Sequence, residues 1–198
     1  MPDSSLSSRA ALTDHIVPPQ GSRVTIVERA DLGLATLQAR KGQDTALREA
    51  VQHHYGLTLP RTPAVVGTDS IAFVGLGPQH WLAVSDGRSH LLAPSLKAAI
   101  GPLGSVVDQS GGYAVVRVGG PAIRDVLAKS FPIDLHDGAF PPGAAATTVV
   151  GHIGAIMWRN ADEHGHPCFD IAVFRSLSQS FWRWFSDAAA EFGGEVKT

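Results

Sequence analysis

The segment 162–168 holds the densest group of side chains that could do chemistry. It contains two carboxylates, two imidazoles and a thiol: Asp162, Glu163, His164, His166 and Cys168. Carboxylate, imidazole and thiolate groups are all zinc ligands. The segment lacks the paired ligand spacing of structural zinc sites, and Gly165 and Pro167 are typical of a loop between strands. We therefore favour a connecting loop over a metal site and expect Cys168 to begin the next strand.

Two other groups could supply an acid or a base. His53 and His54 fall in a predicted helix, where we expect His54 to face the core and His53 the solvent. Asp108 and Asp134 flank strand and helix ends, where carboxylates commonly accept hydrogen bonds from backbone amides. None of these four residues has an identifiable catalytic partner, so we assign none of them a catalytic role.

Glycine-rich motifs of enzymes are also incomplete. The sequence contains no G-x-S-x-G turn, which presents a nucleophilic serine. The clusters at 75–77 and 119–121 complete neither a G-x-G-x-x-G motif nor a phosphate-binding loop with its lysine, and we interpret both as turns and helix caps. The sequence therefore predicts no catalytic, cofactor-binding or metal-binding residue.

Tryptophans are the better candidates for contact with a partner, because large aromatic side chains fill cores and anchor interfaces. Trp184 lies on an apolar helical stripe and is predicted to be core. Trp182 lies off that stripe, next to Arg183. We predict Trp182, Arg183 and Trp158 as residues of a partner interface.

Composition limits the class of protein. The chain has 198 residues, 44% of them hydrophobic, with a formal net charge of −2 and a single cysteine. Such a chain can bury a core, has no basic field that would recruit nucleic acid or an anionic membrane, and needs no oxidising compartment. Residues 1–20 are polar and Ser-rich and are expected to form a flexible arm. We expect a cytoplasmic protein.

Hydrophobic periodicity predicts a first half over residues 21–103. Short strands are expected around Val24, Ile26, Leu34 and Leu37. A helix should start at a cap on Asp44 and end at Gly56. A hairpin over 71–76 and 81–84 and a helix over 92–100 complete this half.

The second half, residues 104–198, begins again with strands at 106–107 and 113–118. A helix with Pro121 at its first position follows, and then strands at 147–150, 153–158 and 169–174. A last helix should begin at a capping box of Ser176 and Gln179 and end at Gly193-Gly194. The order predicts an α+β fold: two tightly packed ferredoxin-like layers with mostly antiparallel sheets, forming one compact unit.

Several segments together resemble one known family. They are Gly77-Pro78-Gln79-His80-Trp81-Leu82, Val107-Asp108-Gln109-Ser110, Gly120-Pro121-Ala122 through Asp125-Val126-Leu127-Ala128-Lys129, Asp134-Leu135, Phe140-Pro141-Pro142-Gly143 and Phe169-Asp170 through Arg175-Ser176. In order and separation, from about residue 20 to the end of the last helix, they resemble the gamma subunit of bacterial heterotetrameric sarcosine oxidase.

This resemblance implies a fold similar to the folate-binding aminomethyltransferases, or glycine-cleavage T-proteins. It also implies a non-catalytic accessory subunit that assembles with alpha, beta and delta subunits. The family's complex demethylates sarcosine to glycine and passes the one-carbon unit to tetrahydrofolate. FAD, FMN and NAD belong to the alpha and beta subunits and zinc to the delta subunit, so no cofactor is expected on this chain, which should be inactive alone.

Three alternatives stay open. The chain could serve a related complex that acts on another N-methyl amino acid, such as N-methylglutamate. It could be a stand-alone folate-binding protein or aminomethyltransferase, although it is short for one. Last, it could bind a metal through His164, His166 and Cys168.

Overall fold

Two antiparallel five-stranded sheets form the centre of the structure, a computed structural model that describes residues 11–12, 23–87 and 89–193. Sheet A has the order β1 (Thr25–Glu28), β7 (Tyr113–Gly119), β10 (Cys168–Phe174), β9 (Ile153–Arg159), β8 (Ala145–Val150). Sheet B has the order β3 (Val65–Gly67), β4 (Ala72–Gly77), β5 (His80–Asp86), β2 (Leu32–Ala39), β6 (Gly104–Asp108). The predicted α+β fold with antiparallel sheets is confirmed.

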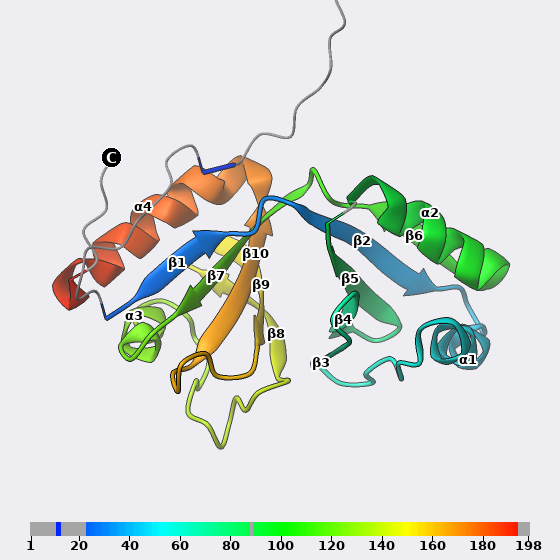
Figure 1. The fold of residues 1–198 in the computed structure, drawn as a ribbon, viewed down its shortest axis with the longest axis horizontal. Coiled ribbons are helices and arrows are strands. Elements are labelled where there is room, and N and C mark those ends of the chain that lie inside the picture. Colours follow the sequence, from blue (N-terminus) through cyan, green and yellow to red (C-terminus); the bar gives the residue numbers. More distant parts are fainter. Residues whose placement is uncertain (1–10, 13–22, 88, 194–198) are drawn as a thin grey trace, which may run out of the picture.

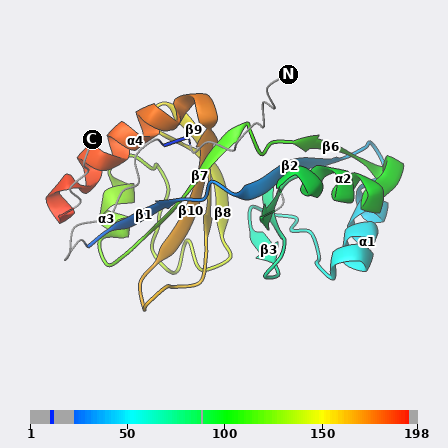
Figure 2. The same cartoon turned by 45° about the horizontal axis from the view of Figure 1, so that its top comes forward.

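The helices cover the outer faces of the sheets, and the inner faces of the sheets meet (Figures 1 and 2). Helices α1 (Asp44–Tyr55) and α2 (Ser89–Ile100) pack on sheet B, and α3 (Ile123–Ala128) and α4 (Ser178–Ala189) pack on sheet A. Short 3-10 helices η1 (Gly101–Leu103), η2 (Arg175–Leu177) and η3 (Ala190–Phe192) adjoin α2 and both ends of α4. The layers therefore run helix, sheet, sheet, helix.

Alternation along each strand divides the apolar residues among three cores. On β10, Phe169, Ile171 and Val173 belong to the core beneath α3 and α4. Ala172 belongs to a separate core between the sheets, together with Val115, Ile156, Trp158 and Ala145 of sheet A. Sheet B contributes Leu32, Leu34, Val74 and Leu82 to this inter-sheet core. Because central strands are buried on both faces, they read as nearly continuous apolar runs.

Each sheet contains one strand from the other predicted half of the chain. β1 pairs with β7, so it joins the sheet of the second half. β6 pairs with β2, so it joins the sheet of the first half although it follows residue 103. Strand pairing depends on partners distant in sequence, and therefore the sheets do not follow the predicted boundary between 103 and 104. The short strand β3 was not expected.

Helix starts differ from prediction, whereas their ends agree more closely. The N-cap of α1 is Gln43, and Asp44 instead accepts two hydrogen bonds from Nε of Arg48, at 3.0 and 3.1 Å. Ser176 caps nothing, because η2 precedes α4 and Ser178 donates its hydroxyl to the carbonyl of Arg175 at 2.8 Å.

Three further expectations concern the ends of elements. Pro121 precedes α3, whose N-cap is Ala122. Gly56 ends α1 with a left-handed φ of 69°, and Gly193 ends η3 with a φ of 80°. Of the predicted N-terminal arm, only Ala11 and Leu12 fall within the described residues.

Backbone hydrogen bonds join the two sheets at one margin, and a further bond extends the β1–β7 pairing where the chain passes to β2. The amide of Val65 donates to the carbonyl of Gly143 at 2.8 Å, and the Gly143 amide donates to the Arg159 carbonyl at 2.9 Å. Where β1 passes into β2, the Arg29 amide donates to Val115 at 2.8 Å. Gly143 holds its position with a φ of 89°, a conformation that residues with a Cβ rarely adopt.

We predict that Gly143→Ala lowers the free energy of unfolding by about 1–2 kcal/mol, because the left-handed backbone is strained in L-residues. Gly154→Ala is the matched control, since Gly154 has no positive φ and an added Cβ would meet no atom within 4 Å. Urea denaturation of both variants measures the difference. Equal stability of the two would contradict this role of Gly143.

Candidate functional site

The segment 162–168 forms a tight hairpin turn and not a metal cage. Glu163 and His166 exchange backbone hydrogen bonds at 2.9 and 3.0 Å, and His164 and Gly165 have φ of 53° and 78°. Two positive φ values between paired strands are the pattern of a type I′ turn. Both histidines are exposed, whereas Cys168 is buried at the start of β10, as predicted. In the described part of the chain, no three metal-ligating side chains converge.

The carboxylates of this segment bind arginines. Asp162 accepts a hydrogen bond from Nη2 of Arg159 at 2.8 Å, and Glu163 accepts one from Nη1 of Arg117 at 3.1 Å. Burial is the largest cause that raises the pKa of the Cys168 thiol to about 12, with the Glu163 charge adding to it. A thiol with such a pKa is protonated near neutral pH and is therefore a poor nucleophile.

The other predicted acid and base candidates have structural positions. His53 and His54 are both exposed, so the expectation that His54 faces the core is wrong; Tyr55, next to it, packs on the core instead. The Asp108 carboxylate accepts a hydrogen bond from the backbone amide of Ser110, and the Asp134 carboxylate accepts one from the amide of His136, each with an N···O distance of 2.9 Å. Both aspartates thus cap backbone amides, as the sequence predicted.

The tryptophans separate into core and surface. Trp158 is 3% exposed and lies in the inter-sheet core, so it is corrected from an interface residue to a core residue of this chain. The neighbours of Trp158 along β9 are apolar on both faces of the strand. The sequence alone could not show whether a partner protein or a second sheet of this chain covers the face that carries Trp158. Trp184 packs on the core and donates its Nε1 hydrogen to Ser130 at 2.8 Å. Trp182 is half-buried against Phe185, and Arg183 is exposed.

The strongest polar cluster was missed by sequence reasoning. Asp170, whose side chain is 5% exposed, accepts two hydrogen bonds from Arg117, from Nε at 2.7 Å and from Nη2 at 2.8 Å. Arg29, between β1 and β2, lies 3.7 Å from the same carboxylate and also pairs with Asp86 at the end of β5. The signal in the sequence was a charge inside an apolar run, in YAVVRVG and CFDIAVF.

Arg159 forms a second cluster of polar contacts, which positions residues 137–140 in the loop before β8. Arg159 is 2% exposed, pairs with Asp137 and donates to the carbonyl of Phe140 at 2.9 Å. The hydrogen bond from Arg159 is the largest cause that lowers the pKa of Asp137. Arg159 therefore positions residues 137–140 next to β9.

A small cleft opens between the sheets where the Asp170 cluster lies. Its volume is about 160 Å³, and its walls include Arg29, Asp86, Arg117, Asn160 and Asp170. Ligand pockets are usually larger, about 300 Å³ or more. The hydrogen bond to Asp170 is the largest cause that raises the pKa of Arg117, so this guanidinium stays charged.

Two of the three carboxylates that line the cleft are paired with guanidiniums. Asp170 pairs with Arg117 and Asp86 with Arg29, whereas the third, Asp69, is exposed. The only thiol in the sequence, Cys168, is held neutral by burial. We therefore read the cleft as a structural ion-pair cluster. None of the helices in the described ranges is long and apolar enough to cross a membrane.

Comparison with protein families gives one match over most of the chain. Residues 40–191 match the model described as "Sarcosine oxidase, gamma subunit family". The chain is 32% identical over 200 residues to the sarcosine oxidase subunit gamma of Corynebacterium sp. (strain P-1), a match that covers 96% of this chain and 95% of that protein. The subunit gamma of Arthrobacter sp. is 30% identical over 193 residues, covering 95% and 93% of the two chains.

Solved structures show the same fold. A chain of the heterotetrameric sarcosine oxidase from Corynebacterium sp. U-96, solved in complex with pyrrole 2-carboxylate, superposes with a TM-score of 0.76 at 30% identity and covers 90% of each chain. The aminomethyltransferase T of the glycine cleavage system from Bartonella henselae has a TM-score of 0.63 at 12% identity. That match covers 83% of this chain but 45% of the aminomethyltransferase, and it shows the fold alone.

We predict that Asp170→Asn lowers the free energy of unfolding by about 2–3 kcal/mol, because the nearly buried Asp170 charge is shared by Arg117 and Arg29, which then keep only the more exposed carboxylates of Glu163 and Asp86. Asp86→Asn is the control, since the Asp86 side chain is 62% exposed and an exposed ion pair contributes less than about 1 kcal/mol. Urea unfolding of the two variants tests this. Similar losses for both would show that Asp170 does not hold the cluster.

We also predict that the Cys168 thiol of the folded chain reacts with a thiol reagent at pH 8 at least about a hundredfold more slowly than that of the urea-unfolded chain. The folded pKa is raised, so this group stabilises the fold at low pH and loses its contribution as pH rises from about 9 towards 12. Labelling kinetics report on this residue alone because the chain has one cysteine. Fast labelling at pH 8 would show that the thiol is accessible.

Proposed function

Because this chain belongs to the sarcosine oxidase gamma subunit family, we propose that it is the gamma subunit of a heterotetrameric sarcosine oxidase. In this role it is an accessory subunit of a complex that oxidatively demethylates sarcosine to glycine. The observation that carries the proposal is the match of nearly the whole chain, at 90% coverage of both chains, to a chain from such a heterotetramer. A shared fragment could not produce this match.

The internal chemistry of the chain supports an accessory role. Asp86 and Asp170 of the inter-sheet cleft are held by Arg29 and Arg117, and the one thiol is buried with a raised pKa. Such groups stabilise a fold, whereas a catalytic acid or base needs a pKa near the working pH and access to substrate. We propose that the chemistry of the complex belongs to other subunits.

The same proposal implies the partner subunits and the cofactors that they carry. The partners would be alpha, beta and delta subunits, with FAD, FMN and NAD on the alpha and beta subunits and zinc on the delta subunit. Tetrahydrofolate would accept the one-carbon unit on a partner and not on this chain. The complex would work in the cytoplasm.

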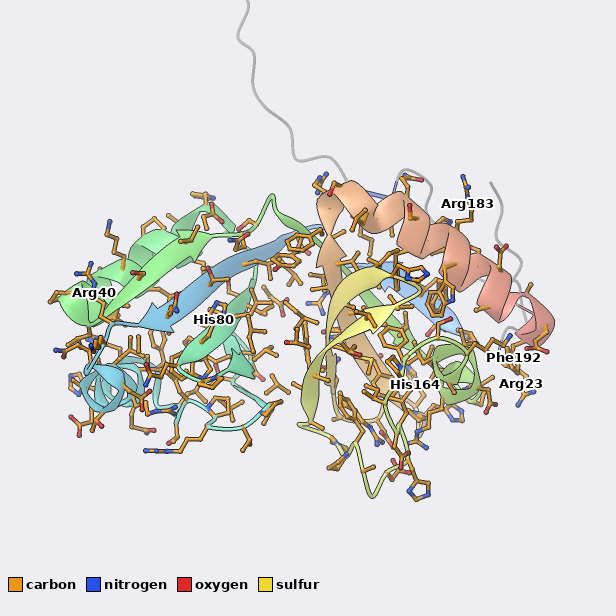
Figure 3. All side chains as sticks on the ribbon, turned by 180° about the vertical axis from the view of Figure 1, so that it is seen from behind. Arg23, Arg40, His80, His164, Arg183 and Phe192 are labelled. Carbon is orange, nitrogen blue, oxygen red and sulfur yellow. The ribbon has the colours of Figure 1, made fainter. Side chains whose placement is uncertain are left out.

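The outer side of α4 is our proposed contact with a larger subunit. Trp182 stacks on Phe185 with ring centroids 6.3 Å apart and keeps part of its ring exposed, and Arg183 is exposed beside it. In Figure 3, Arg183 projects from α4 away from sheet A. A half-exposed tryptophan next to an arginine is the composition that interface anchors favour.

A stand-alone folate-binding protein or aminomethyltransferase is the second candidate. The fold match to the aminomethyltransferase favours it, but this chain corresponds to less than half of that enzyme. Titration of the isolated chain with tetrahydrofolate separates the two, because micromolar binding, about −8 kcal/mol, would support the second candidate. A related complex acting on another N-methyl amino acid would give the same purification result as sarcosine oxidase and a different substrate.

Co-expression of the tagged chain with the other subunits tests the main proposal. We expect larger chains to co-purify with a flavin absorption spectrum and sarcosine-dependent oxidase activity, and the isolated chain to be colourless and inactive. Arg183→Glu should weaken assembly at least about tenfold, because it reverses a charge at the proposed contact. Arg40→Glu is the control on the far layer, where Arg40 is exposed after β2. A colourless lone chain would contradict the accessory role, and equal assembly of both variants would contradict the α4 contact.

A further inference from the structure

The N-terminal part of the chain meets the body at Ala11 and Leu12. The amide of Ala11 donates to Oε1 of Glu28 at 2.6 Å, and the amide of Leu12 donates to Oε2 of the same side chain at 3.0 Å. Nε2 of Gln179, at the start of α4, donates to the carbonyl of Ala11 at 3.4 Å. One carboxylate thus binds two successive backbone amides, and these charge-assisted bonds are stronger than neutral ones.

The side chain of Leu12 completes the contact. It is 7% exposed and belongs to the same core as Ile26 of β1 and Phe181 of α4. Ala11 packs against this core as well. The contact therefore combines backbone recognition by Glu28 with an apolar position for one side chain, which is how proteins commonly bind extended peptide segments.

The number of residues between Leu12 and Arg23 is sufficient for the same chain to supply the bound segment. Gln179 is the second residue of α4, and both Gln179 and Glu28 bind Ala11. Arg23 donates its amide to Phe192 beyond the other end of the helix, where Figure 3 shows both residues. From residue 179 to residue 192 a helical path rises roughly 20 Å. Leu12 and Arg23 are eleven residues apart in the sequence, which permits up to about 36 Å. Residues 11–12 therefore reach this position within one chain.

We propose that Glu28 and the start of α4 form a docking site for an extended backbone segment, which Ala11–Leu12 of the same chain occupies as a releasable latch. It meets the body through hydrogen bonds to Glu28 and Gln179 and through the Leu12 side chain, a local contact that can open without global unfolding. Opening uncovers the position of Leu12 beside β1, an edge strand of sheet A on which Val27 is already 58% exposed. Edge strands and apolar positions of this kind are sites of further strand pairing.

Hydrogen exchange and limited proteolysis of the full chain test the latch. We expect the amides of Ala11 and Leu12 to exchange at least about tenfold more slowly than an unstructured chain, because each donates to a carboxylate. Glu28→Gln keeps the size of the side chain but removes its charge and one acceptor. It should raise amide exchange and chymotryptic cleavage after Leu12 by about tenfold. Glu49→Gln, an exposed carboxylate on α1, is the control and should change neither rate.

Amide exchange and the urea unfolding midpoint of a Leu12 variant distinguish local release of residues 11–12 from unfolding of the whole chain. Leu12→Ala removes the buried side chain and should also raise exchange at both amides, while the unfolding midpoint in urea moves much less than for a central core residue. Unprotected amides at residues 11 and 12 in the unmodified chain would overturn the proposal. So would cleavage after Leu12 at the same rate in Glu28→Gln and Glu49→Gln.

Discussion

The face-to-face packing of the two sheets is the constraint on which the rest of the structure depends. Pairing of β7 with β10 gives the inner face of sheet A three zones, because opposed residues share a face: Tyr113 with Phe174, Val115 with Ala172 and Arg117 with Asp170. The middle zone is apolar and packs on sheet B. The aromatic pair, stacked at 5.0 Å, and the ion pair occupy its two ends. Packing therefore decides which polar residues meet.

The ion-pair zone shows how a charge can serve structure in a place that resembles a site. Asp170 lies where an apolar strand residue would otherwise be, and it is retained because two arginines from different elements neutralise it. Arg29 pairs with Asp170 of sheet A and with Asp86 of sheet B, so the cluster links the residue between β1 and β2 to both sheets. A polar cleft in this fold is thus compatible with an assembly role.

The fold itself does not determine the activity. At 12% identity the chain shares its architecture with an aminomethyltransferase of which the match covers 45%, whereas at about 30% identity it matches gamma subunits over 93–95% of their length. Because one fold supports unrelated chemistry, the functional conclusion depends on the family and on the pairing state of particular carboxylates. The family match supports the gamma-subunit role.

The sequence by itself determined the elements whose signals are local. Short apolar runs bounded by turn residues located the β4–β5 hairpin, β9 and β10, Gly56 ended α1, and Cys168 began β10. The Asp108 and Asp134 caps also depend only on residues two positions away. Only the tertiary structure decided that β1 and β6 exchange sheets, that Trp158 is core, and that Arg29, Arg117 and Asp170 meet. These depend on which faces pack together, and no local period encodes a partner far along the chain.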